Sequence, residues 1–164
     1  SSGLDLKHPD GVATLLDLML NAHPAIFASG EVLKLNRQLK IKDARRGTHA
    51  PCSCGAPSLW ECPFWSAVDR RTTETSGKSL VDLDMLDYGT FGQSAPNAVV
   101  FKAMAEVSGK SFVVDSSKLP GRLSYLTTLK ETSTSIRCIL CVSRRGRSTP
   151  WCGSRRLPQA YLPL

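Results

Sequence analysis

The feature that most constrains the fold is an alternation of short apolar runs and polar turns in the second half of the chain. Phe112-Val113-Val114 is a β-branched run that ends in the polar turn Asp115-Ser116-Ser117-Lys118. A helical pattern follows from Pro120 to about Leu129, and residues 136–142 (IRCILCV) form a second apolar run. Such runs are typical of buried strands, and a helix between two of them makes the strands parallel. The sequence therefore predicts an α/β fold with a parallel sheet.

Polar residues follow both predicted strands. They occupy positions 115–118 and 143–147. In parallel sheets ligands bind at the carboxyl ends of the strands. We therefore expect these two turns to contribute to a binding site.

Other segments add predicted helices. Residues 12–22 carry Leu15, Leu16, Met19 and Leu20 on one apolar face, which predicts a helix there. Helices are also predicted over about 32–41 and 97–107, whereas 67–94 is mixed and polar with a weaker helical signal at 80–86.

The start of the first helix is a candidate anion site. A loop containing Gly11 is expected to lead into this helix, which carries Thr14 in its first turn. A helix N-terminus presents unpaired N–H groups and a partial positive charge, which suit phosphate or sulfate. A helix that begins after Asp and Gly is also commonplace, so this pattern alone leaves a purely structural interpretation open.

Four motifs in a fixed order supply the context for that helix. The motifs are Thr14-Leu15-Leu16 with His23-Pro24 and Gly30-Glu31, then Cys52-Ser-Cys54-Gly-Ala-Pro with Cys62-Pro-Phe-Trp65, then Val113-Val114-Asp115-Ser116-Ser117-Lys118-Leu-Pro120, and finally Arg137-Cys-Ile-Leu-Cys-Val-Ser-Arg144. Together they resemble the N-terminal part of sulfotransferases that use 3′-phosphoadenylyl sulfate (PAPS), of the bacterial or protein-tyrosine sulfotransferase type. The resemblance covers about residues 9–147.

The resemblance implies a fold, an activity and roles for individual residues. The fold would be a parallel sheet of the P-loop nucleoside-triphosphate-hydrolase-like type, here as a partial domain. The activity would be transfer of a sulfuryl group from PAPS to a hydroxyl or amine, without a metal. Glu31 would be the catalytic base and Lys118 a catalytic contact to the substrate or sulfuryl group. The donor-binding residues would be Gly11, Thr14 and Arg144.

The chain also departs from the family pattern. Asp10 stands where the family has a basic residue that contacts the donor, and Val12-Ala13 replaces the Gly-Thr of the loop. A carboxylate at position 10 would repel the sulfuryl donor, so the sequence leaves open whether activity is retained. The alternative is a non-catalytic, truncated remnant. We expect residues 1–147 to form the partial domain, with a Cys- and Pro-rich irregular insert at 43–66, and 148–164 to be an irregular basic tail.

The positive charge of the chain is concentrated at one end. The formal net charge is +7, but residues 137–164 hold six Arg and no acid, which leaves +1 for the other residues. A nucleic-acid binder using this Arg-rich tail is a second alternative. It is not favoured, because the tail lacks a helical pattern or interleaved aromatic residues.

Three cysteines in the irregular insert allow several interpretations. Cys52, Cys54 and Cys62 have the residue type of zinc ligands, with His49 as a possible fourth. Cys-x-Cys is not the usual Cys-x-x-Cys spacing, and a disulfide involving Cys62 or simple packing of buried thiols are the alternatives. No metal is expected from the sulfotransferase resemblance.

The sequence says less about compartment and acceptor. No apolar run reaches about 18 residues, so no membrane span is expected. The resemblance leaves the compartment open between the cytoplasm and the Golgi lumen. It also leaves the acceptor open among small molecules, carbohydrates and proteins.

Overall fold

A short parallel sheet organises the chain. The computed structural model describes residues 9–40, 51–117, 119–132 and 138–140, and within them three strands pair in the order β1 (Ile26–Ala28), β2 (Phe112–Asp115), β3 (Cys138–Leu140). Ile26 pairs with Phe112 and Val113 pairs with Cys138, both in parallel register. The α/β character and the parallel sheet predicted from the apolar runs are therefore confirmed.

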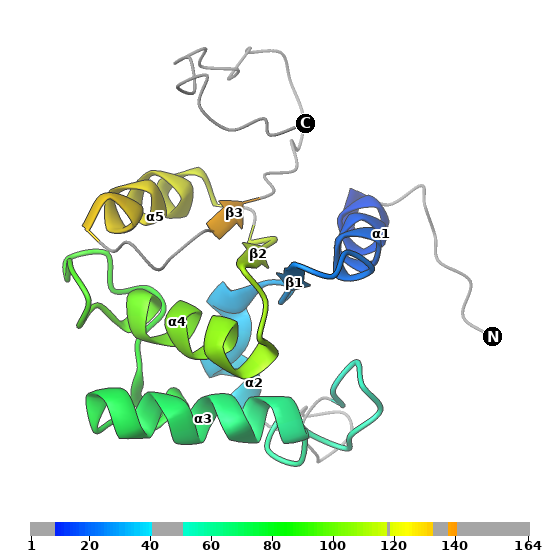
Figure 1. The fold of residues 1–164 in the computed structure, drawn as a ribbon, viewed down its shortest axis with the longest axis horizontal. Helices are drawn as coiled ribbons and strands as arrows, with labels where there is room; N and C mark the ends of the chain where they lie inside the picture. Colours follow the sequence, from blue (N-terminus) through cyan, green and yellow to red (C-terminus); the bar gives the residue numbers. More distant parts are fainter. Residues whose placement is uncertain (1–8, 41–50, 118, 133–137, 141–164) are drawn as a thin grey trace, which may run out of the picture.

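Helices surround this sheet on several sides (Figure 1). α4 packs against β2 and α3 lies alongside α4, while α5 lies beside β3 and α1 beside β1. The helical elements are α1 (Pro9–Asn21), η1 (Val32–Lys34), α2 (Leu35–Lys40), α3 (Pro63–Ser76), η2 (Leu80–Asp82), α4 (Pro96–Ser108) and α5 (Pro120–Thr132).

The core is centred on α4. Val99, Val100 and Met104 are buried because this helix contacts both the sheet and α3. Pro96 begins the helix and Gly109, at φ 65°, ends it in the left-handed conformation that glycine adopts without strain. This helix was predicted over 97–107 and is confirmed.

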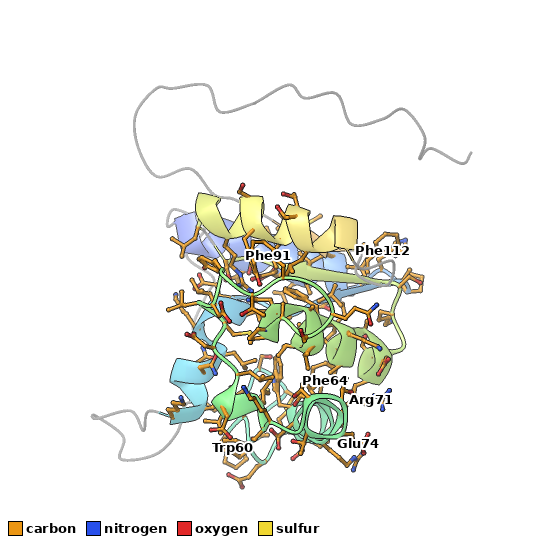
Figure 2. All side chains as sticks on the ribbon, turned by 90° about the vertical axis from the view of Figure 1, so that its left-hand side faces the viewer. Trp60, Phe64, Arg71, Glu74, Phe91 and Phe112 are labelled. Carbon is orange, nitrogen blue, oxygen red and sulfur yellow. The ribbon has the colours of Figure 1, made fainter. Side chains whose placement is uncertain are left out.

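α3 was not predicted as a helix. It begins at Pro63, so the irregular segment that we expected over 43–66 ends at Cys62. Only three of its residues are buried, and they are Trp65, Val68 and Thr72. The remaining surface is polar. In Figure 2 Arg71 and Glu74 lie on the outer side of the helix, where Arg71 Nη1 is 3.3 Å from the Glu74 carboxylate.

α1 differs in length and burial from the prediction. The helix begins at Pro9 rather than Val12. Its expected apolar face is not in the core, because Leu15, Leu16 and Met19 are all exposed, Met19 to 64%. Its last residue is tied to the sheet: the Asn21 side chain accepts from Ala28 N–H (2.8 Å) and donates to Ala28 C=O (2.9 Å).

None of the described helices is long and apolar enough to cross a membrane.

Candidate functional site

The carboxyl ends of β1 and β2 meet in one hydrogen-bonded edge. The Ser29 hydroxyl and N–H both donate to Val114 C=O, at 2.7 and 3.0 Å, and Ser116 N–H donates to Gly30 C=O at 2.9 Å. Gly30 has φ 73°, a conformation that side chains other than glycine rarely adopt, and it turns the chain out of β1. The two family-like motifs, Gly30-Glu31 and Asp115-Ser116-Ser117, are therefore side by side.

Asp115 is the buried centre of this edge. Its Oδ1 accepts hydrogen bonds from Val32 N–H (3.2 Å), Ser117 N–H (2.9 Å) and the Ser117 hydroxyl (2.5 Å). The hydroxyl of Ser117 in turn accepts from Leu33 N–H at 3.1 Å. A carboxylate with this many donors is well compensated for burial. Asp115 thus holds the turn after β1 against the turn after β2.

Arg122 of α5 compensates the negative charge of the Asp115 carboxylate. Its Nε donates to Asp115 Oδ2 at 2.7 Å, and both side chains are fully buried. Nη1 donates to Met85 C=O at 3.0 Å, and the guanidinium lies 5.9 Å from the ring centre of Phe101. The pair therefore joins α5, β2 and the 83–94 segment. Sequence reasoning missed Arg122, because nothing in its local pattern shows which carboxylate it meets.

α1 reaches the same edge through Asp17. The Ser116 hydroxyl donates to Asp17 Oδ2 at 2.8 Å. Thr14 precedes Asp17 by three residues, so the two share one side of the helix. Thr14 is exposed. The motif Thr14-Leu15-Leu16 was recognised in the sequence, but the contact of the next residue, Asp17, with Ser116 was not predicted.

Glu31 stands at the exposed side of the edge. Its side chain is 24% exposed and forms an ion pair with Lys34. It occupies the N-cap position of η1, but its side chain makes no capping hydrogen bond there. The carboxylate is thus held at the carboxyl end of β1, within reach of solvent.

The other predicted site residues have different outcomes. Gly11 lies in the first turn of α1, so the prediction that it belongs to a loop before the helix is wrong. Pro9 explains the difference, since proline is favoured at the first helical position, where its missing N–H costs nothing. The role of Gly11 in binding the donor stays a prediction. Lys118 and Arg144 lie outside the described residues.

A separate cavity of about 590 Å³ lies between the end of α3, the 83–94 segment and the start of α4. Lys78, Lys102 and Asp87 contribute charged side chains to its lining. A hydrogen bond from the Thr90 hydroxyl lowers the pKa of the Asp87 carboxyl, with help from the Gly89 N–H. Of the residues described, none from the strand edge lines this cavity.

A third cluster brings together three free thiols. The Sγ atoms of Cys52, Cys54 and Cys62 all lie within 4.8 Å of one another. Burial raises the pKa of the Cys52 thiol to about 11, whereas a backbone hydrogen bond from Ala56, followed by contacts with the other two thiols, lowers the pKa of Cys54. His49, the fourth ligand considered from the sequence, lies outside the described residues.

In comparisons with known proteins, no family model, curated protein or solved structure matches the chain.

Proposed function

We propose that the chain transfers a sulfuryl group from PAPS to a hydroxyl or amine acceptor at the carboxyl edge of the β1–β2 sheet. The observation that carries this proposal is the direct hydrogen bonding of two motifs 85 residues apart, with Ser29 bonded to Val114 and Ser116 bonded to Gly30. A parallel sheet places such turns where ligands bind. Both motifs belong to the four that carry the resemblance to sulfotransferases.

The reaction is an in-line displacement at sulfur. The acceptor oxygen or nitrogen attacks the sulfur atom, the bond from sulfur to the 5′-phosphate oxygen breaks, and the acceptor proton passes to a base. The products are a sulfated acceptor and 3′-phosphoadenosine 5′-phosphate. The protein must therefore supply a positioned base, cations for the leaving phosphate, and a geometry that aligns donor with acceptor.

Glu31 is the proposed base. It is the carboxylate at the exposed side of the edge, whereas Asp115 is fully buried and already accepts four hydrogen bonds. The ion pair with Lys34 limits the directions in which the Glu31 carboxylate can point. Asp17 is less suitable, because it accepts from the Ser116 hydroxyl.

The basic side chains that would bind the donor are assigned from the sequence resemblance. Lys118 follows directly on the Asp115–Ser117 turn, and Arg144 follows the last strand. An arginine there can bind a phosphate through two parallel hydrogen bonds. Asp10 lies in the first turn of α1, at a position where the sequence resemblance expects a basic residue. Loss of one charge-assisted contact costs about 1.5–3 kcal/mol, so a weakened donor site is compatible with the proposal.

Calorimetric titration with 3′-phosphoadenosine 5′-phosphate tests the donor site. We expect micromolar binding that is lost in Arg144→Ala. Arg70→Ala, which removes an exposed arginine of α3, is the matched control and should bind as the unaltered chain does. A folded chain that does not bind would support the non-catalytic alternative, and binding that survives Arg144→Ala would remove that residue from the site.

Glu31→Gln separates catalysis from binding. The variant should retain donor-product binding but lose turnover of PAPS with a panel of phenols, alcohols and amines. Glu74→Gln removes an exposed carboxylate on α3 and should leave turnover unchanged. Equal turnover in all three proteins would exclude Glu31 as the base.

A further inference from the structure

The three-thiol cluster lies in a segment that the proposed sulfuryl transfer does not use. Cys52 and Cys54 belong to the irregular chain before α3, and Cys62 is the N-cap residue of α3. Their Sγ atoms lie within 4.8 Å of one another, and the Cys54 and Cys62 atoms are 3.5 Å apart. Three thiols facing one point on a surface is an arrangement that hydrophobic packing alone does not require.

The backbone around the first two cysteines forms a tight turn. Gly55 N–H donates to Cys52 C=O and Cys52 N–H donates to Ala56 C=O, both at 2.9 Å. Gly55 has φ +94°, which favours glycine at this position. The turn reverses the chain, so that residues 52 and 54 can both direct their sulfur atoms toward Cys62. The cluster is thus held by backbone hydrogen bonds and not only by side-chain contacts.

The spacing of the sulfur atoms suits a tetrahedral metal ion. Zn–S bonds are about 2.3 Å long, so two thiolates on one tetrahedral zinc lie about 3.8 Å apart. Only small shifts separate the observed cluster from that geometry. Soft thiolate ligands select ions such as zinc, and the N-terminus of α3 at Cys62 contributes a partial positive charge that offsets the excess negative charge of three thiolates.

We propose that Cys52, Cys54 and Cys62 bind one zinc ion as thiolates, with a nitrogen or oxygen ligand in the fourth position. Each thiol releases its proton to solvent when the Zn–S bond forms, and no electron is transferred. The described residues bring three sulfur ligands together, which leaves one position of a tetrahedral zinc ion for a nitrogen or oxygen ligand such as water. Cys54 is exposed while Cys52 and Cys62 are buried, so the ion can enter from the side of Cys54.

A disulfide fits the same residues less well. It would join two of the three thiols at about 2.05 Å and leave the third unpaired beside them. It would also need an oxidant. A zinc ion would bind all three sulfur atoms, and its binding requires no oxidant.

The role of such an ion would be structural. The segment 51–62 is irregular, and it reaches α2 through the Trp60 indole N–H, which donates to Leu39 C=O at 3.2 Å. Trp60 precedes Pro63, the first residue of α3, by three residues. Zinc at the cluster would fix this segment to the first turn of α3, away from the β1–β2 edge.

Metal content and cobalt spectroscopy test the proposal on the full chain. The chain is purified under reducing conditions, given zinc, and dialysed, and zinc is measured by mass spectrometry. We expect one zinc per chain. Replacement by Co²⁺ should give thiolate-to-metal charge-transfer bands and the visible absorption of a tetrahedral ion, and X-ray absorption should show three sulfur ligands and one lighter ligand.

Two variants provide the comparison. Cys54→Ser changes the exposed ligand and should reduce retained zinc to near none while the far-ultraviolet circular dichroism stays the same. Ser53→Ala changes an exposed side chain without a thiol in the same turn and should retain one zinc. Zinc retained in Cys54→Ser, fewer than three sulfur ligands, or no zinc in the reduced unaltered chain would each overturn the proposal. Neither readout depends on PAPS, so failure here is separable from failure of the proposed function.

Discussion

At the scale of single residues, the buried pair of Asp115 and Arg122 is the interaction most sensitive to change. Arg122→Ala would leave the Asp115 carboxylate buried without its cation, and breaking a fully buried pair in this way costs about 3–5 kcal/mol. We expect a loss of that size in the free energy of unfolding, measured by urea denaturation.

The control for this prediction is Arg70→Ala, which should change stability by less than about 0.5 kcal/mol because Arg70 is exposed. The double variant Asp115→Asn with Arg122→Leu removes both charges and should be more stable than Arg122→Ala. An Arg122→Ala protein as stable as the Arg70 variant would contradict the pairing.

The sequence predicted the place of Asp115 but not its function. A carboxylate directly after a β-branched run marks the carboxyl end of a strand, and that placement is observed. Its partner could not be predicted, because the contact between Arg122 and Asp115 depends on how α5 packs in the folded chain. The same packing brings Arg122 to the Met85 carbonyl. Contacts of this kind depend on tertiary packing, which a single sequence does not encode in any local spacing.

At the scale of elements, the apolar pattern predicted helices and strands correctly where most residues of the element are buried. α4 and β2 were predicted because most of their residues face the core. α3 was missed because its buried stripe contains one threonine and only two apolar residues among charged neighbours. α1 shows the opposite case, since its apolar periodicity predicted a core face that is exposed in the described part of the chain.

This contrast predicts different costs for the same substitution in two helices. Leu126→Ala in α5 removes a side chain that is 4% exposed and should destabilise the protein by about 2–5 kcal/mol. Leu18→Ala in α1 removes one that is 55% exposed and should cost less than about 0.5 kcal/mol. Urea midpoints of the two variants give the comparison. Similar losses in both would mean that α1 buries Leu18 against another part of the protein.

The ion pair between α3 and α4 predicts that the free energy of unfolding depends on pH. Arg71 Nε donates to Glu106 at 2.5 Å, and this hydrogen bond lowers the pKa of the Glu106 carboxyl below its ordinary value of 4.5. A lowered folded-state pKa contributes stability above the unfolded value, and that contribution disappears as the pH falls through the folded value.

We therefore expect the unaltered chain to be more stable than Glu106→Gln at pH 7, with the difference shrinking below pH 4.5. Both side chains are more than a third exposed, so the difference should be small and should decrease in high salt. Free energies of unfolding at pH 3 and pH 7, with and without 1 M salt, test this. A constant difference at all pH values would contradict the ion pair.

At the scale of the whole molecule, three elements converge on one edge of the sheet. β1 and β2 supply the turns, and α1 joins them through the bond between Asp17 and Ser116. The sequence predicted that the turn after β2 lies at the carboxyl end of a parallel sheet, together with residues 143–147, which lie outside the described residues. The strand β1 and its turn were not predicted. Nor did the sequence predict that α1 begins at Pro9, because the family-like loop pattern and the preference of proline for the first helical position compete there.

The most direct test is to map ligand contacts by amide chemical shifts in NMR. The chain is titrated with 3′-phosphoadenosine 5′-phosphate, and amide resonances are followed to saturation. Binding at the β1–β2 edge should give the largest shifts at residues 30–33 and 115–117, with residues 66–76 of α3 unchanged. Saturable shifts confined to the cavity between α3 and α4, or no shifts in a folded chain, would contradict it.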